Sequence, residues 1–393
     1  MRHALLVASL VACGGSGTNA TPDASAPDTP APDGPAGCAR SPAPADRARF
    51  VVVSRPYDSA GMPANTFEVL ELSQSGALTR PSPARTFTLG RAVTGTIAFT
   101  PDGENGIAAL EDGKLGVFHL DASGAVTVVD AGFAGSFYAS RVAIDPRGDR
   151  AIVLDGNTRE NGGGLYAVTI GCDGALTDHG MLAAAKLPGG VGFAGDRALV
   201  AASDLLDSPP TGDDVHLVQL GDPPARIAGA DAFGDDEAIV GGTALTFDGG
   251  KFLIGDTSQF SNVPNRVAIV AINGSALKPL GTVMVEDPEA IVASPFGNVA
   301  VVASAFGDAL FVLDEDTGAW RVRGQVTYKG GKPQLPGDVA AIDRGALRGH
   351  VLVSENVSVR QLAFHEDGSV EDVGSLAFGD GLESISGAIG VTP

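Results

Sequence analysis

The sequence of 393 residues is poor in aromatic and basic residues, and each scarcity disfavours a class of function. Aromatic residues make up 6% of the chain, with one Trp and four Tyr, which disfavours a carbohydrate-binding surface built from exposed rings. Lysine and arginine total 26 against 47 acidic residues, for a net charge of −21. That balance disfavours nucleic acid and anionic lipid as partners, because phosphates require basic groups. Beyond the N-terminus no stretch reaches the roughly 18 apolar residues of a membrane helix.

The short motifs of catalysis and metal binding are absent as well. The sequence has no HExxH or CxxC arrangement, no GxSxG nucleophile motif and no GK[ST] phosphate loop. Its histidines after His3 are not paired with other ligand types, so we expect structural or surface roles for His119, His179, His216, His350 and His365. Motifs therefore indicate neither a catalytic residue nor a cofactor.

The N-terminus has the pattern of an export signal. A positive start at residues 2–3 precedes an apolar run at residues 4–10, and small residues then lead into Cys13. This order is typical of a signal peptide and too short for a membrane span. The four residues that end at Cys13, LVAC, resemble the lipobox of bacterial lipoproteins. The resemblance implies a signal peptide over residues 1–12, acylation of Cys13 and, since glycine follows the cysteine, the outer membrane. An ordinary short apolar start is the alternative.

A disordered tether is expected over residues 13–47. This segment contains seven prolines among Ala, Asp, Ser and Thr and no large apolar residue, so it cannot offset the entropy of ordering. If Cys13 is acylated, Cys38 and Cys172 remain as a pair in an exported, oxidising setting. We expect a disulfide between them that fixes the end of the tether to the folded domain.

The rest of the chain repeats a unit of about 48 residues seven times. An apolar segment runs into a tight turn in IAFTPDG at residues 97–103, and similar segments occur at 142–148, 244–250 and 291–297. A second turn marker recurs in step with the first, as in DASGAVT at 121–127 and DGALT at 173–177. Short strands at such a period, with 54 glycines for the turns, predict an all-β, seven-bladed propeller with four-stranded blades over residues 48–393.

The two ends of the chain are expected to share one blade. First strands begin near residues 96, 141, 190, 243, 289, 338 and 386, but the strand at 50–54 has no such segment before it. The segment at 385–391 is the spare one. It should therefore pair inside the first blade and close the ring, which removes a free sheet edge.

These units resemble the blades of the seven-bladed lactonase/YVTN class of propellers, which carry an apolar strand, a P-[DN]-G turn and a later D-G-x-L turn. The WD dipeptide of WD40 propellers is absent, since the single Trp320 precedes arginine. Some members of the lactonase-like class open sugar lactones or cyclise muconates, and many relatives have no known reaction. No catalytic motif of the class can be matched to this sequence residue by residue.

Binding is expected on the face that carries the longer loops, at residues 55–65, 155–164, 203–213 and 255–265, because long loops on a rigid scaffold commonly form binding sites. The connections between blades on this face are acidic and include two arginines. The candidate residues are Arg91, Arg141, Asp235, Asp236, Glu237, Asp287, Glu289, Asp338, Asp380 and Glu383. Converging carboxylates could hold Ca²⁺, although their spacing matches no calcium loop and solvated turn residues are the simpler interpretation.

Two functional hypotheses follow. The first is a lipid-anchored extracytoplasmic monomer that binds an unidentified protein or small molecule through the acidic long-loop face. The alternative is a lactonase-like hydrolase or isomerase with its site at the mouth of the central channel. A closed pocket in which Arg91 or Arg141 meets two acidic residues would favour the enzyme, and an open acidic funnel would favour the binding module.

Overall fold

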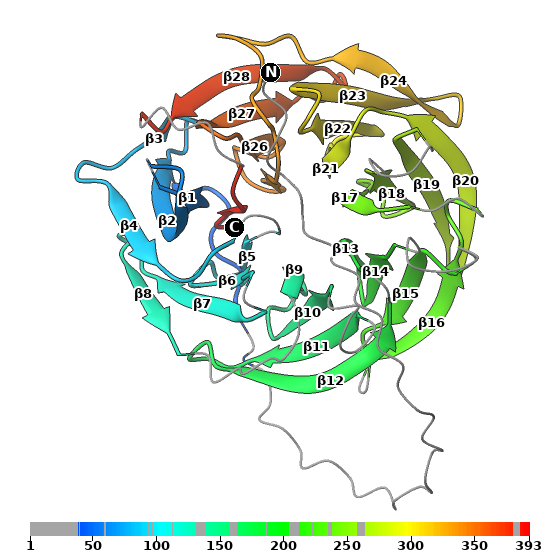
Figure 1. Cartoon of the computed structure of the whole chain (residues 1–393), viewed down its shortest axis with the longest axis horizontal. Coiled ribbons are helices and arrows are strands. Elements are labelled where there is room, and N and C mark those ends of the chain that lie inside the picture. Colours follow the sequence, from blue (N-terminus) through cyan, green and yellow to red (C-terminus); the bar gives the residue numbers. More distant parts are fainter. Residues whose placement is uncertain are drawn as a thin grey trace, which may run out of the picture. The chain divides into compact units, whose positions relative to one another are not determined.

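The computed structural model describes residues 38–393 except 39, 59, 93, 94, 96, 112, 131–138, 157–162, 186, 204–211, 222, 223, 235–237, 258–263 and 380–385. Seven sheets are arranged in a ring (Figure 1). The fold is all-β, and among the described residues no helix is long and apolar enough to span a membrane. The predicted signal peptide and Cys13 lie outside the described residues.

Each blade has four strand positions, numbered outward from the centre of the ring. The first strands of blades 1 to 7 are β29 (Ile389–Val391), β5 (Ile97–Phe99), β9 (Ala139–Ile144), β13 (Gly190–Ala194), β17 (Val240–Leu245), β21 (Pro288–Ala293) and β25 (Val339–Ala341). The second strands are β1 (Arg49–Tyr57), β6 (Asn105–Ala109), β10 (Arg150–Asp155), β14 (Arg197–Ala201), β18 (Lys251–Asp256), β22 (Val299–Ser304) and β26 (His350–Ser354).

The outer two positions complete the blades. The third strands are β2 (Pro63–Leu72), β7 (Leu115–Leu120), β11 (Gly164–Ile170), β15 (Val215–Gln219), β19 (Arg266–Asn273), β23 (Ala309–Asp316) and β27 (Ser358–Phe364). The fourth strands are β8 (Val126–Val129), β12 (Leu176–Ala184), β16 (Ala225–Ala230), β20 (Ala276–Met284), β24 (Ala319–Gln325) and β28 (Val370–Ala377). In blade 1 the fourth position is divided between β3 (Leu78–Thr79) and β4 (Arg85–Thr88), which both pair with β2.

The C-terminal strand closes the ring as the sequence predicted. Strand β29 pairs antiparallel with β1, placing Val391 opposite Val51 and Ile389 opposite Val53. It also contacts the first strands of both neighbouring blades, β25 and β5. The last strand of the chain is thus the innermost strand of blade 1, and its pairing with β1 joins the two ends of the ring.

The recurrent turns keep step with the blades because their side chains satisfy the turn backbone. At the turn from β5 to β6, the Thr100 hydroxyl donates to Asp102, and Gly103 adopts a φ of 76° that disfavours a side chain. At the turn from β7 to β8, the Asp121 carboxylate accepts from the Ser123 and Ala125 amides. We call the face with these turns the short-turn face, and the opposite face the long-loop face.

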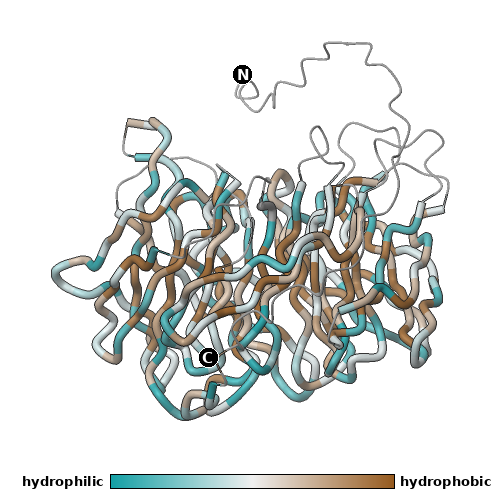
Figure 2. The backbone as a smooth tube through the Cα atoms, turned by 90° about the horizontal axis from the view of Figure 1, so that it is seen from below, coloured by the Kyte–Doolittle hydropathy of each residue, from teal (hydrophilic) through white to brown (hydrophobic). Residues whose placement is uncertain are grey.

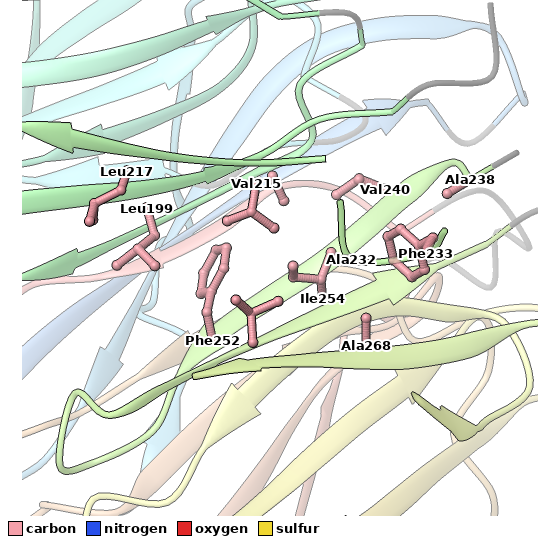
Figure 3. Packing of buried hydrophobic residues seen from close by; sticks show 12 residues of the cluster. Leu199, Val215, Leu217, Ala232, Phe233, Ala238, Val240, Phe252, Ile254 and Ala268 are labelled. Carbon is pink, nitrogen blue, oxygen red and sulfur yellow. The ribbon is translucent and has the colours of Figure 1, made fainter. Parts of the chain in front are cut away.

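The hydrophobic core consists mainly of layers between adjacent blades. Figure 3 shows one such layer, in which Leu199, Val215 and Leu217 of blade 4 lie near Phe252 and Ile254 of blade 5. The second and third strands are apolar on both sides because each is covered by two neighbouring blades. Hydrophobic residues accordingly gather in the strands, and many turns are hydrophilic (Figure 2).

A segment before β1 is fixed across the short-turn face. Cys38 and Cys172 form a disulfide bond, and the Arg40 guanidinium donates to Asp102 and to the Gly171 carbonyl. Arg49, which is almost fully buried, donates to the carbonyls of Thr392 and Arg344. Residues before 48 therefore contact the ring, and the compact unit of the chain runs from Pro35 to Pro393.

Candidate functional site

The candidate site lies where first strands begin on the long-loop face. Arg141 is on β9 of blade 3, Glu289 is on β21 of blade 6, and Asp338 immediately precedes β25 of blade 7. Asp287 comes just before β21. Since first strands surround the centre of the ring (Figure 1), residues far apart in sequence face a common space. We call Arg141, Asp287, Glu289 and Asp338 the channel cluster.

Arg141 is the cation of the channel cluster. Its guanidinium Nη1 lies 3.9 Å from Asp338 Oδ1, an ion pair longer than a direct hydrogen bond. The side chains of Arg141 and Asp338 are 19% and 6% exposed. The Ile389 amide of the closing strand donates to Asp338 Oδ2 at 3.1 Å. Ring closure therefore orients a carboxylate of the site.

The backbone just before β21 has an unusual conformation at Asp287. Asp287 has a φ of 43°, in the left-handed region that few residues other than glycine adopt. Its carboxylate accepts from the Phe306 amide at 2.8 Å, and the Glu289 amide donates to the Asp287 carbonyl at 2.8 Å. Such conformations cost energy and are concentrated at functional sites.

Two carboxyl groups of the cluster have raised pKa values. Burial raises the pKa of Glu289 to about 7; the charges of Asp287 and Asp338 add to the rise, and Arg141 opposes it. Burial also raises the pKa of Asp338 to about 6, against the lowering effects of Arg141 and of the Ile389 and Val339 amides. Near neutral pH Glu289 can thus either accept or donate a proton, which general acid–base catalysis requires.

A cavity of about 250 Å³ adjoins this cluster among the first strands of blades 2 to 7. Arg141 itself lines the cavity, and so do Ala290 and Val339, the residues that follow Glu289 and Asp338 in the chain. Apart from Thr243, the other lining side chains are apolar and include Phe99, Ile144 and Phe193. The arrangement is a pocket with a few polar groups in an apolar wall, which is typical of small-molecule sites.

Glycines allow the first strands to approach closely around this cavity. A Cβ on Gly190 would lie 2.1 Å from Thr243 Cγ2, and one on Gly242 would lie 2.3 Å from the Ala290 backbone. Blades 4, 5 and 6 could not keep these distances with side chains at either position. The sequence analysis explained glycine by turns alone and missed this second use.

Hydroxyl and carboxylate groups at the ends of second strands hold the connections between blades. The Ser354 hydroxyl donates to the Gly387 carbonyl at 2.7 Å, and the Ser354 amide donates to the Asp338 carbonyl at 2.9 Å. Ser203 Oγ accepts from the Val240 amide, and Asp256 accepts from the Ile239 amide. The sequence analysis did not identify these residues, although a Ser or Asp closing an apolar second strand is a visible pattern.

The other predicted site residues divide into two groups. Arg91 pairs with Glu111 at 2.7 Å and donates to the Tyr57 hydroxyl at 2.6 Å, whereas Arg141 pairs with Asp338. Asp235, Asp236, Glu237, Asp380 and Glu383 lie outside the described residues. Of the ten candidates, the structure brings Arg141, Asp287, Glu289 and Asp338 together.

In the described part of the chain no group of three or more His, Cys, Asp or Glu side chains is arranged to hold a metal ion. His119 and His216 lie on the third strands β7 and β15, as the sequence indicated. Burial lowers the pKa of His216 to about 4, so this histidine is neutral at physiological pH. His216 therefore has the character of a core residue.

Comparison with known proteins identifies the architecture. No protein-family model and no curated protein matches the sequence. Among solved structures, a putative 6-phosphogluconolactonase from Bacteroides uniformis superposes with a TM-score of 0.64 at 11% identity, over 88% of this chain and 99% of that one. The periplasmic gluconolactonase of Pseudomonas aeruginosa gives 0.61 at 15% identity, over 88% and 99%. The chain is thus a seven-bladed propeller whose structural neighbours include lactonase-like propellers, and at these identities the likeness shows the fold alone.

Proposed function

We propose that this protein is a hydrolase that opens a lactone at the channel cluster. The observation that carries the proposal is Arg141 placed beside two carboxyl groups with raised pKa values, at a cavity lined mainly by apolar side chains. Perturbed carboxyl groups in a concave site are a physical signature of catalysis. The names of two structural neighbours, a gluconolactonase and a putative 6-phosphogluconolactonase, support the same substrate class.

The proposed reaction uses the residues in distinct roles. Ionised Glu289 removes a proton from a water molecule as the water oxygen forms a bond to the lactone carbonyl carbon. The Arg141 guanidinium stabilises the negative charge that develops on the carbonyl oxygen. The bond from the carbonyl carbon to the ring oxygen then breaks, and the proton held by Glu289 passes to that oxygen. The product is a hydroxy acid. Asp338 and Ser354 are positioning residues: the first pairs with Arg141, and the second holds the backbone of the first.

Hydrolysis of a lactone panel tests the proposal, with proton release followed by a pH indicator. The panel is δ-valerolactone, an alkyl-substituted δ-lactone and glucono-δ-lactone. Arg141→Gln and Glu289→Gln should each lower kcat/KM by about 100-fold or more. The matched control is Arg321→Gln, which removes an exposed guanidinium on outer strand β24 and should leave the rate unchanged.

Two results would contradict the proposed hydrolase activity. One is a wild-type protein with no activity above the uncatalysed rate on any lactone of the panel. The other is activity that survives both channel substitutions. Either result would favour the alternative of a binding module that uses the acidic long-loop face to hold a protein or small-molecule ligand.

We propose separately that the protein is exported and anchored through an acylated Cys13 to the outer membrane, as a monomer. The disulfide between Cys38 and Cys172 supports an extracytoplasmic location, since disulfides persist in oxidising compartments. Labelling with a fatty-acid analogue in a bacterial host should mark the wild-type protein and spare Cys13→Ser. Equal labelling of both would contradict the anchor.

A further inference from the structure

We infer that the substrate is an uncharged lactone with an apolar substituent rather than a phosphorylated sugar lactone. The inference rests on the proposed hydrolase and deepens it. The lactone carbonyl would lie at Arg141, and the substituent would extend along the apolar first strands. The charges around the cavity disfavour a phosphate group, and the side chains that line it favour an apolar substituent.

The charge of the channel cluster opposes a phosphate group. The cluster contains three carboxyl groups and one guanidinium, and with pKa values of about 7 and 6 for Glu289 and Asp338 it keeps a negative net charge at neutral pH. Arg141 is the one charged residue among the described residues that line the cavity, and Asp338 already shares its charge. Phosphate sites commonly supply a bidentate arginine or a helix N-terminus. The described lining residues include no second cation to balance a phosphate dianion.

The wall of the cavity opposes a polyhydroxylated substituent. Besides Arg141, Thr243 supplies the one polar side chain among the described lining residues. The other side chains are apolar, and Phe99, Ile144 and Phe193 lie near the ends of first strands β5, β9 and β13, toward the short-turn face. Sugar hydroxyls buried there would find one neutral polar side chain to replace the hydrogen bonds that they lose to water. An alkyl chain would instead be removed from water, which is favourable.

The size of the cavity limits the substituent. About 250 Å³ is below the roughly 300–1,000 Å³ of pockets for drug-sized ligands. The space therefore fits one lactone ring with a short chain. Each methylene buried should raise kcat/KM about three- to fourfold until the cavity is full.

The test compares δ-valerolactone, δ-decalactone with its pentyl substituent, glucono-δ-lactone and its 6-phosphate ester. We expect kcat/KM for δ-decalactone to exceed that for δ-valerolactone at least tenfold, and the phosphate ester to be hydrolysed more slowly than glucono-δ-lactone. Ala143→Leu, which adds volume to the lining, should abolish the preference for the alkyl chain and keep activity on δ-valerolactone. Ala319→Leu, on the exposed surface of β24, is the matched control.

A binding measurement separates specificity from catalysis. The δ-lactam with a pentyl substituent, a poorly hydrolysed analogue of δ-decalactone, should raise the Tm of wild type and not of Ala143→Leu, after circular dichroism shows that the variant is folded. Preference for the phosphate ester, or slower hydrolysis with the alkyl substituent, would overturn the inference and leave the hydrolase intact. A protein that hydrolyses no lactone of the panel would overturn the hydrolase and this inference together.

Discussion

Two groups in this ring have nearly the same composition and opposite character. The channel cluster sets Arg141 among three carboxylates, and the Arg360 cluster in blade 7 sets Arg360 between Glu355 and Asp372. Arg360 is 3% exposed and lies 2.6 Å from Asp372. Burial alone would lower its pKa, but hydrogen bonds and charge from Glu355 and Asp372 raise it instead. Arg141 is 19% exposed and stands 3.9 Å from Asp338.

The contacts of the two clusters distinguish a structural arginine–carboxylate group from one that a ligand can reach. In the Arg360 cluster the Glu355 carboxylate also accepts from the Ser358 hydroxyl, and the guanidinium donates further to the Gly331 carbonyl. These contacts connect β27 to its neighbours and leave little of the charge for a ligand. In the channel cluster Arg141 lines a cavity, whereas Arg360 is enclosed within its blade. A charged side chain that reaches a cavity is available to a ligand.

The largest effect should come from breaking the Arg360 cluster. Arg360→Gln would leave two buried carboxylates without their cation, and such a loss costs about 3–5 kcal/mol of the free energy of unfolding. Urea denaturation at pH 7.5 measures it, and Arg321→Gln, an exposed pair on β24, should cost about 0–1 kcal/mol. A loss below about 1 kcal/mol for Arg360→Gln would show that the Arg360 cluster is not structural.

The next effect should have the opposite sign. Because the pKa of Glu289 is raised to about 7 in the folded protein, its protonated carboxyl favours folding. This contribution to the free energy of unfolding is complete below pH 4.5 and is lost as the pH rises toward and through about 7. Glu289→Gln removes that penalty. After allowance for the partial exposure of the side chain, the variant should be more stable than wild type by about 1–2 kcal/mol at pH 8 and similar to it at pH 4.5.

The matched substitution in the other cluster is Asp372→Asn. It removes the charge that accepts from the Arg360 guanidinium and the Lys329 amide, so it should destabilise the protein at both pH values, by about 1.5–3 kcal/mol at pH 8. Thermal and urea unfolding at the two pH values measure all three proteins. A Glu289→Gln variant that is destabilised at pH 8 would mean that the ionised carboxylate supports the fold, as in the Arg360 cluster.

The sequence predicted the ring and its closure because both depend on local, repeated signals. Turn markers such as TPDG identify strand boundaries by themselves. The strand at 50–54 lacked a partner, and the spare segment at 385–391 was predicted to supply it; the structure forms this strand over Ile389–Val391. Arg141, Glu289 and Asp338 could be grouped because they occupy the same place in different repeats, and a closed ring brings that place to the centre.

The rest depended on contacts that have no short-range pattern. Arg91 was grouped with Arg141 in the prediction, yet in the structure it contacts Glu111 and Tyr57. These residues lie near Arg91 in blades 1 and 2. The Arg360 cluster was not predicted, since its members meet through the pairing of β26, β27 and β28. The raised pKa values come from burial in three dimensions, which charge counts along the sequence do not contain.

The smallest expected effect separates Asp338 as a charge from Asp338 as a structural acceptor. Its negative charge raises the pKa of Glu289, and an asparagine would keep an oxygen for the Ile389 amide while removing that charge. Hydrolysis requires ionised Glu289, so in Asp338→Asn the acidic limb of the kcat/KM profile should move to lower pH by about 0.5–1 unit. NMR titration of the Glu289 carboxyl carbon should show the same shift without substrate. Asp316→Asn, which removes an exposed carboxylate that pairs with Arg321 on the outer strands, should leave both titrations in place. A limb that moves to higher pH, or a Glu289 titration that does not move, would show that the two carboxyl groups do not act as one cluster. The channel site would then resemble the Arg360 cluster, in which each carboxylate serves a contact of its own.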